Sequence, residues 1–286
     1  MNFYCRWAPS LGALEDSHQN IWGTKEYNEG SLNSPAVFFG LYDARDYLAL
    51  LRHRGPRFIL WAGSDIKNLV NNFYFNDGKL KWLSRIFPIS NMWLKDFIRE
   101  KCMNYVENQT EAMALSLLDI PSVIVPSFLG KVESYKITYK SHKTPNVYLS
   151  ASEGRQREYG WLLVEELAKI TPWVNFHLYG AKWRGTRPNI FTHGRVPKEK
   201  MNEEVSKMQC GLRLNAFDGF SEITAKSVLW GQYPITTIKN PYLDHLIKID
   251  DWFDLMHELR TKRKANVSAR NFYFKEFNNY PWNTNK

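Results

Sequence analysis

Short apolar runs alternate with amphipathic stretches along the first half of the chain. The strand-like runs are rich in β-branched and aromatic residues and lie at 36–42, 56–66, 102–108 and 121–128. Between them, apolar residues recur at helical spacing in 44–55, 91–101 and 110–120, whereas 67–90 is irregular and aromatic. This alternation predicts a parallel sheet with helices packed against it.

The same alternation begins again after a lysine-rich, weakly patterned stretch at 129–144, which we interpret as a linker. Further strands are expected at 146–151, 174–180, 189–196, 210–216 and 233–238. Helices are expected at 159–170, at 197–208, after Ser221, and in two charged stretches at 251–263 and 265–279.

Alternation repeated across a linker predicts an α/β protein with two Rossmann-like, doubly wound domains that face each other across a cleft. We expect domains at 1–143, including the linker, and at 144–250. The helices of 251–286 are expected to pack back toward the N-terminal domain. Ligands of such sheets bind beyond the carboxyl ends of the strands, so the cleft is the expected site.

The net charge of the chain indicates an anionic partner. The chain of 286 residues carries a formal net charge of +9, spread along its length rather than gathered in one tail. Such an excess favours phosphate, nucleotide, nucleic acid or an acidic membrane surface as partner. The densest basic clusters, 131–143 and 262–264, are equally consistent with solvated faces.

The cysteines and the apolar runs indicate the cellular compartment in which the protein is expected. Cys5, Cys102 and Cys210 are an odd set, far apart, whose spacing matches neither a disulfide framework nor a zinc site. This usage is typical of a reducing cytosol. No apolar run approaches the roughly 20 residues that span a bilayer, and the N-terminus lacks the features of a signal peptide. We expect a cytoplasmic protein, with or without contact to an anionic membrane.

One stretch, FDGFSEITAKSVLWGQYP at 217–234, combines an acid, a glycine turn and a helix. The N-terminus of that helix would present unpaired N–H groups and a positive dipole end to a diphosphate. Gly219 permits close approach of the backbone, and Ser221 would either cap the helix or donate to a phosphate oxygen. A plain strand–helix junction, with Glu222 and Lys226 as an ordinary ion pair four residues apart, is the alternative.

Other candidate residues follow predicted strands. In SEGRQRE (152–158), Arg155 would clamp a diphosphate or lie in a solvated loop. Arg195 precedes a proline-initiated helix, where the backbone would face a base. In the first half, Glu107 and Asp65 end strands, and Asp65 would bind a substrate hydroxyl, act as a base or cap a helix.

Common catalytic signatures are missing from the sequence: there is no Walker lysine loop, HExxH, GxSxG or Gly-x-Gly-x-x-Gly motif. The order of the motifs over 146–238 instead resembles glycosyltransferases of the GT-B fold. It is most similar to the large retaining family with a Glu, seven residues, Glu motif. The pieces that carry the resemblance are NVYLSASEGRQRE, VNFHLYG, THGRVPKEKM, CGLRLNAFDGFSE and WGQYPIT. The resemblance implies an N-terminal acceptor domain and a C-terminal domain for a nucleotide-sugar.

The resemblance also implies roles for single residues. Asp218 stands where the first acid of the motif contacts the donor sugar. The turn whose amides approach sugar and phosphate is formed by Gly219, Phe220 and Ser221. The second acid, which contacts the ribose in that family, is replaced by Lys226.

Further positions match, less closely, the residues that bind the nucleotide-sugar donor in that family. Arg155 corresponds to the basic loop residue that binds diphosphate. Gly180 ends a strand where the family has glycine, and Arg195 lies in the G-x-V-P segment. Glu222 would compensate for the missing second acid, although it lies one helical turn earlier.

These observations predict a glycosyltransferase that moves a sugar from a nucleotide-sugar to a glycan, lipid-linked or other hydroxyl acceptor. Arg155, the helix N-terminus at Ser221 and Lys226 would stabilise the leaving diphosphate, so no metal or other cofactor is expected. Retention of configuration is expected; an inverting enzyme would use Asp65 or Glu107 as base.

Two alternatives stay open. Lys226 in place of an acid is consistent with a GT-B-like protein that binds nucleotide or glycan without turnover. The net charge of +9 is consistent with a glycosyltransferase acting on nucleic acid, the least expected of the partners.

Overall fold

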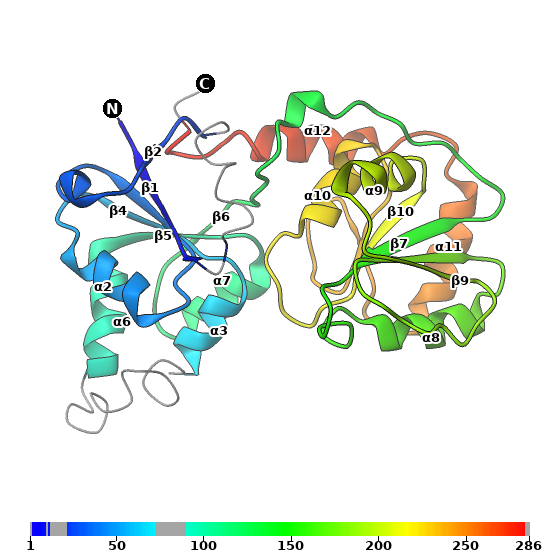
Figure 1. Ribbon diagram of the computed structural model, residues 1–286, viewed down its shortest axis with the longest axis horizontal. Helices are drawn as coiled ribbons and strands as arrows, with labels where there is room; N and C mark the ends of the chain where they lie inside the picture. Colours follow the sequence, from blue (N-terminus) through cyan, green and yellow to red (C-terminus); the bar gives the residue numbers. More distant parts are fainter. Residues whose placement is uncertain (1, 10, 12–21, 72–89, 284–286) are drawn as a thin grey trace. The chain divides into compact units, whose positions relative to one another are not determined.

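The computed structural model describes residues 2–9, 11, 22–71 and 90–283, which form two compact units (Figure 1). The first unit comprises 1–131, 217–219 and 276–286, and the second comprises 132–216 and 220–275. Each unit contains a six-stranded sheet in which every pair of neighbouring strands is parallel. The predicted pair of doubly wound α/β domains is therefore confirmed.

The sheet of the first unit has the strand order β2-β1-β3-β4-β5-β6. Its strands are Tyr4–Trp7 (β1), Lys25–Glu26 (β2), Ala36–Phe39 (β3), Arg57–Leu60 (β4), Cys102–Val106 (β5) and Val123–Ile124 (β6). Its helices are Glu29–Ser31 (η2), Ala44–Arg52 (α2), Ser64–Val70 (α3), Ser90–Lys101 (α6) and Gln109–Ser116 (α7). The central strand β3 is buried along its whole length, as a strand covered on both faces requires.

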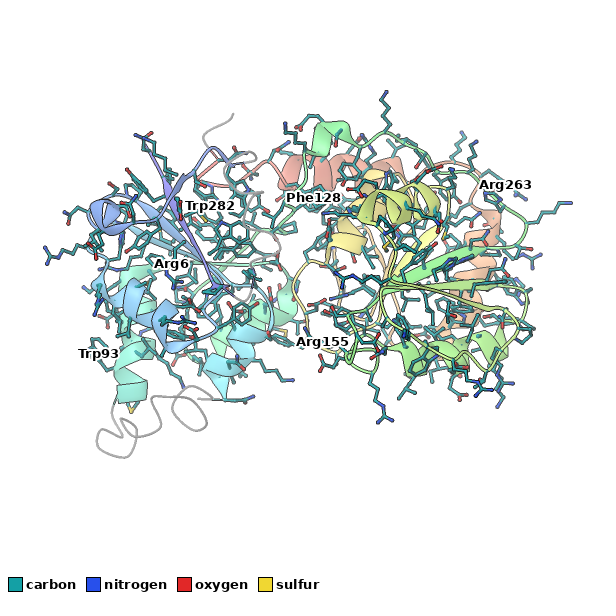
Figure 2. The ribbon with its side chains drawn as sticks, in the orientation of Figure 1. Arg6, Trp93, Phe128, Arg155, Arg263 and Trp282 are labelled. Atoms are coloured by element: carbon teal, nitrogen blue, oxygen red, sulfur yellow. The ribbon has the colours of Figure 1, made fainter. Side chains whose placement is uncertain are left out.

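Two apolar clusters cover the faces of this sheet. The first consists mainly of side chains from α2, α3, α6 and α7 packed on β3 and β4, and includes Leu50, Ile66 and Ile98. The second is aromatic: Trp22, Tyr280 and Trp282 are each at most 1% exposed and pack against one another. Trp282 is labelled in Figure 2.

Several local differences from the sequence expectation lie in the first unit. Strand β1 was not predicted, because only four residues alternate between half-buried and buried. The expected strand 56–66 ends at Leu60, and residues from Ser64 onward form helix α3. Gly63, with φ of 85°, turns the chain between the two, a conformation that suits glycine. Of the stretch expected to be irregular, 72–89 lies outside the described residues.

The sheet of the second unit has the order β12-β11-β10-β7-β8-β9. Its strands are Asn146–Ser150 (β7), Asn175–Tyr179 (β8), Ile190–Gly194 (β9), Cys210–Arg213 (β10), Ile235–Thr236 (β11) and Asp244–His245 (β12). Counted from β7, this is the Rossmann order 3-2-1-4-5-6 read from the other side. The order reverses between β7 and β10, which makes the gap beyond their carboxyl ends the switch point where such folds bind ligands.

Helices cover both faces of this second sheet (Figure 1). They are Trp161–Ile170 (α8), Lys198–Val205 (α9), Glu222–Leu229 (α10), Asp251–Thr261 (α11) and Val267–Glu276 (α12), with Val132–Ser134 (η3) before β7. Side chains of α8 and α11 share one core cluster with the sheet. Side chains of α9 and α10 share another, around Tyr148, Tyr179 and Trp230.

The division of the chain differs from the expected boundaries at 143 and 250. Part of the stretch interpreted as a linker is attached to the second unit: Thr138 N and Tyr139 N donate to Trp230 O, and Tyr139 is buried. Helix α11 and most of α12 also belong to the second unit. Among the described residues, no helix is long and apolar enough to cross a membrane.

Candidate functional site

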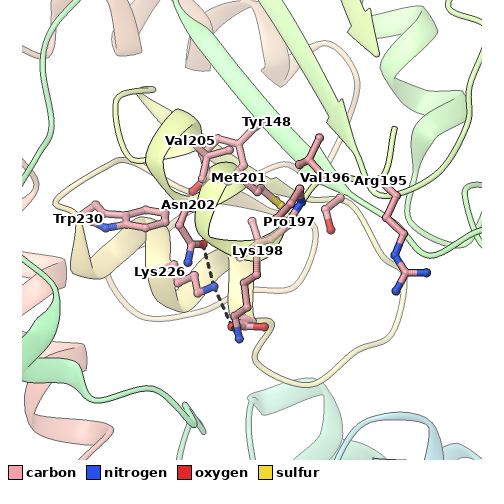
Figure 3. A pocket seen from close by; sticks show the side chains of 13 residues that line it. Tyr148, Arg195, Val196, Pro197, Lys198, Met201, Asn202, Val205, Lys226 and Trp230 are labelled. Carbon is pink, nitrogen blue, oxygen red and sulfur yellow. Dashed lines mark hydrogen bonds and ion pairs between the residues drawn. The ribbon is translucent and has the colours of Figure 1, made fainter. Parts of the chain in front are cut away.

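A pocket of about 600 Å³ lies at the carboxyl end of β7 in the second unit (Figure 3). Tyr148 and Ser150 reach it from β7, two positions apart and therefore on the same face of the strand. The remaining walls come from the segment between β9 and α9 and from helices α9 and α10. Four segments that are far apart in sequence thus build one cavity beside the switch point.

Two helices begin at this pocket. Helix α9 follows Pro197, and helix α10 follows Ser221, whose Oγ accepts a hydrogen bond from Thr224 N at 3.2 Å. The first residues of both helices line the cavity. Because the N-terminal end of a helix carries a partial positive charge and N–H groups without intrahelical partners, both ends favour an anion in the pocket.

Charged side chains strengthen that preference. Three basic residues and one acid line the pocket, so its formal charge is +2; they are Arg195, Lys198, Lys226 and Glu222. The ammonium groups of Lys226 and Lys198 lie 2.8 and 3.0 Å from the same atom, Glu222 Oε1. Lys226 Nζ also donates to Asn202 Oδ1 at 2.9 Å (Figure 3). A dianion such as a diphosphate would balance this charge.

The ion pair between Glu222 and Lys226 is not an ordinary surface pair. The Lys226 side chain is only 8% exposed, against 46% for Glu222. Burial lowers the pKa of Lys226, and Glu222 opposes that shift. Burial raises the pKa of Glu222, but Lys226 and Lys198 outweigh this effect, so the pKa lies below its usual value. Glu222 is therefore a carboxylate at neutral pH.

A cluster of acids lies at the carboxyl edge of the sheet in the first unit. Glu107 directly follows β5, and its Oε1 accepts a hydrogen bond from the Ser127 hydroxyl. Glu107 N donates to Glu111 Oε2 at 2.6 Å. Asn108 Nδ2 donates to the backbone oxygen of Asp218 at 2.7 Å, which ties the glycine turn to this edge.

Gly219 is packed tightly within the same cluster. A Cβ at Gly219 would overlap Glu107 Oε2, and a Cβ at Gly63 would lie 3.1 Å from Gly219 N. A side chain at position 219 would therefore have to displace the Glu107 carboxylate. The sequence predicted this need for close approach but assigned it to a phosphate.

Asp65 lies in the first turn of α3 and is completely buried. Its carboxylate accepts hydrogen bonds from Leu41 N, Ala62 N and Ile66 N at 2.9–3.0 Å. Burial raises its pKa to about 6, while these backbone bonds oppose the shift. These contacts hold two strand-end loops together, which is a structural role for Asp65.

The other residues expected to bind the nucleotide-sugar donor do not line the pocket. Arg155 is 54% exposed and pairs with Glu158 at 2.7 Å in the loop after β7 (Figure 2). Gly180 has φ of 95°, and a Cβ there would overlap the backbone oxygen of Ala151, so its glycine requirement is met by the protein itself. Phe220 is buried and stacks on Tyr273, with ring centroids 4.8 Å apart.

The structure thus brings Arg195, Glu222 and Lys226 together in the pocket, and places Asp65, Glu107, Asp218 and Gly219 at the edge of the first sheet. Sequence reasoning missed most of the pocket walls, including Tyr148, Lys198, Met201, Asn202 and Trp230. A usable signal was present for α9, because 198, 201, 202 and 205 fall on one helical face.

No protein-family model matches the chain, and no curated protein matches it. Similarity is found among solved structures. The structure of Anabaena HepE in complex with UDP and glucose has a TM-score of 0.58 and 10% identity, covering 96% of this chain and 95% of HepE. An α,α-trehalose-phosphate synthase (UDP-forming) from Burkholderia xenovorans has a TM-score of 0.58 and 8% identity, covering 87% and 72%.

S. aureus TarM, in complex with UDP, α-GlcNAc-glycerol and Fondaparinux, has a TM-score of 0.52 and 13% identity. The match covers 93% of this chain but 54% of TarM, so this chain spans about half of TarM's length. At these identities the similarity concerns the fold, and the fold is GT-B.

Proposed function

We propose that this protein is a glycosyltransferase that moves a sugar from a nucleotide-sugar to an acceptor hydroxyl. The observation that carries this proposal is the pocket of the second unit. It lies beside the switch point of a Rossmann sheet, has two helix N-termini in its walls and carries a formal charge of +2. The UDP complexes of HepE and TarM, which share the fold, support this choice of ligand.

The chemistry needs mainly electrostatic stabilisation. The bond between the sugar's anomeric carbon and the diphosphate oxygen breaks, and a bond from that carbon to the acceptor oxygen forms. The proton of the acceptor hydroxyl passes to the leaving diphosphate. We propose that Arg195, Lys198 and the N-termini of α9 and α10 stabilise the negative charge on the leaving diphosphate. These protein groups make a metal unnecessary in the proposed mechanism, and activity should therefore survive addition of EDTA.

Asp218 remains the proposed acid for the donor sugar, and retention of configuration the proposed outcome. Should the enzyme invert, Asp65 or Glu107 is the proposed base. Both residues follow strands of the first sheet, and the Asp65 carboxylate accepts hydrogen bonds from three backbone N–H groups. The proposed acceptor is a glycan or a lipid-linked hydroxyl.

The test is a screen of nucleotide-sugars for release of nucleoside diphosphate, with and without acceptors, using wild type and Asp218→Ala. We expect the substitution to lower turnover at least about 100-fold, because a group that stabilises the transition state contributes roughly 3 kcal/mol. Asp254→Ala, which removes an exposed acid from α11, is the matched control and should retain full activity. Undiminished activity of Asp218→Ala would remove Asp218 from the mechanism.

A second candidate function is nucleotide binding without turnover, and Lys226 is the observation that favours it. In the family that this sequence resembles, an acid at the position of Lys226 contacts the ribose. A lysine there removes this contact, unless another acid supplies it. Calorimetric binding of a nucleoside diphosphate, together with no release from any nucleotide-sugar in the screen, would establish this alternative.

A further inference from the structure

Tyr242 occupies a backbone position that tyrosine rarely adopts. The turn from Asn240 to Leu243 lies between β11 and β12, and Leu243 N donates to Asn240 O at 3.4 Å. Pro241 is the second residue of this turn, and Tyr242, with φ of 61°, is the third. This is the pattern of a type II turn, whose third position favours glycine or asparagine. A bulky side chain such as tyrosine is therefore strained there.

The side chain of Tyr242 adds little to the core that would explain this strain. It is 62% exposed, and its ring packs against the half-buried Phe272 of α12, with the ring centroids 5.0 Å apart. Glycine or asparagine at this position would relieve the strain and leave the core closed. A strained residue that presents an aromatic ring to solvent indicates a function for the ring itself.

A series of aromatic rings connects Tyr242 to the residue that follows the glycine turn. Phe272 meets Tyr273 edge-to-face at 5.0 Å, and Tyr273 stacks on Phe220 at 4.8 Å. The hydroxyl of Tyr273 also donates to Pro241 O at 2.9 Å. The two turns follow β10 and β11, which are neighbouring parallel strands of the second sheet. The exposed ring is therefore fixed from behind, at the same carboxyl edge of the sheet as Phe220.

The chemistry of this surface fits a sugar ring. The C–H groups on one face of a pyranose are weakly positive, and the face of an aromatic ring is negative. Lys239 is exposed and Asn240 is half-buried directly before the turn, and these side chains supply donors and an acceptor for sugar hydroxyls. Single-stranded nucleic acid is instead bound by successive rings along a positively charged groove. In the series from Phe220 to Tyr242, Tyr242 alone is exposed.

We propose that Tyr242 is a platform on which a sugar ring of the acceptor stacks, so that the acceptor is an oligosaccharide or a longer glycan. The proposal rests on the proposed function, because it assumes transfer to a glycan. It adds a binding site outside the pocket and narrows the class of acceptor. One sugar residue of the acceptor carries the reacting hydroxyl, and another lies on Tyr242.

Substitutions at position 242 separate the role of the ring from that of the backbone. Tyr242→Phe keeps a stacking ring, whereas Tyr242→Asn removes it and suits the turn better. We expect Tyr242→Asn to raise the midpoint of thermal unfolding by about 2 °C or more, because the strain is relieved. The same variant should bind an oligosaccharide at least about tenfold more weakly, because the stacking contact is lost.

The experiment is a titration of wild type, Tyr242→Phe and Tyr242→Asn, without nucleotide, with maltohexaose, isomaltohexaose, cellohexaose and chitohexaose. Methyl glycosides of glucose and N-acetylglucosamine are the single-sugar probes. We expect wild type to bind one of the hexaoses with a dissociation constant of about 1 mM or tighter, and the matching methyl glycoside at least about tenfold more weakly. Tyr242→Phe should stay within about threefold of wild type. With that hexaose as acceptor, Tyr242→Asn should raise KM and leave donor hydrolysis in the absence of acceptor unchanged.

The control is Phe253→Ala, which removes another exposed ring, 45% exposed on α11, and should leave oligosaccharide binding unchanged. Failure of all four hexaoses to bind wild type would overturn the role of Tyr242. Equal binding by wild type and Tyr242→Asn would do the same, as would loss of binding to a 20-nucleotide oligothymidylate in place of the hexaoses. Each of these results leaves the proposed function intact as long as a nucleotide-sugar is hydrolysed. Absence of hydrolysis of every nucleotide-sugar would overturn the proposed function and the acceptor role together.

Discussion

Among single residues, Glu111 is in an unfavourable environment for a charge. It is completely buried, its Oε2 accepts the bond from Glu107 N, and its Oε1 has no hydrogen-bond partner among the described residues. Burial, followed by the negative charge of Glu107, raises the pKa of Glu111 well above its ordinary value of 4.5. The buried position therefore favours the protonated form of this carboxyl.

This shift predicts how stability depends on pH. The folded-state pKa of Glu111 lies above the unfolded value, so the folded state keeps a proton that the unfolded chain releases. The resulting stabilisation is complete below pH 4.5 and is lost as pH rises through the folded pKa. Glu111→Gln should remove this contribution, which amounts to at most about 1.4 kcal/mol per pH unit.

Urea unfolding of wild type and Glu111→Gln at several values between pH 5 and pH 8 measures the difference. The wild type should lose more of its free energy of unfolding across this range than the variant. Glu100→Gln, at an exposed position of α6, should behave like the wild type. Parallel curves for wild type and Glu111→Gln would show that Glu111 ionises as it does in the unfolded chain.

At the scale of the element, helix α10 shows how one short segment serves both fold and site. Ser221 caps it, Glu222 and Lys226 face the pocket, and the buried residues Ala225 and Leu229 lie one turn apart on its core side. The sequence predicted the start of this helix from Ser221 as a candidate N-cap residue. It left open whether Ser221 is a cap or a phosphate ligand, and the structure shows the cap.

Replacing the cap gives a prediction for this element. Ser221→Ala should lower the free energy of unfolding by about 1 kcal/mol, because Thr224 N loses its acceptor. Ser221→Asp should retain most of the stability, because aspartate also caps helices, but its charge should weaken binding of a nucleoside diphosphate.

Denaturant unfolding and nucleotide titration of both variants separate these effects. Ser206→Ala, which removes a hydroxyl from the C-terminal end of α9, is the control and should cost less than Ser221→Ala. Equal stability of Ser221→Ala and the wild type would contradict the capping role.

For the whole molecule, the net charge of +9 favours binding to polyanions such as nucleic acid. Many basic side chains are already paired with acids; examples are Arg45 with Asp43, Arg99 with Asp96, and Lys207 with Glu203. Exposed pairs of this kind reduce the number of cations that can neutralise phosphates. The charge is also distributed along the chain rather than concentrated in one segment.

We therefore expect weak, nonspecific binding to DNA. Fluorescence anisotropy with a labelled 20-bp duplex should give a dissociation constant of about 1 μM or weaker at 150 mM salt, with a shallow salt slope. A steep slope with nanomolar affinity would instead favour the nucleic-acid alternative. Co-sedimentation with anionic and with neutral vesicles, in the same buffer, tests the expected contact with an acidic membrane surface.

The sequence by itself determined the alternation of strands and helices, and with it the two doubly wound units, because the periodicity of apolar residues reports local burial directly. It also predicted the start of α10 and a close approach of other atoms to the backbone at Gly219. Very short strands such as β1, β2 and β12 were not predictable, since too few residues carry a pattern.

Only the tertiary structure decided what surrounds each candidate residue. The strand order brings β7, α9 and α10 around one pocket, so Tyr148, Asn202 and Lys226 become neighbours although they are far apart in sequence. Long-range packing also places Gly219 against Glu107 and Asn202 against Lys226. Such contacts depend on how distant segments pack, and a local pattern of residues carries no record of that packing.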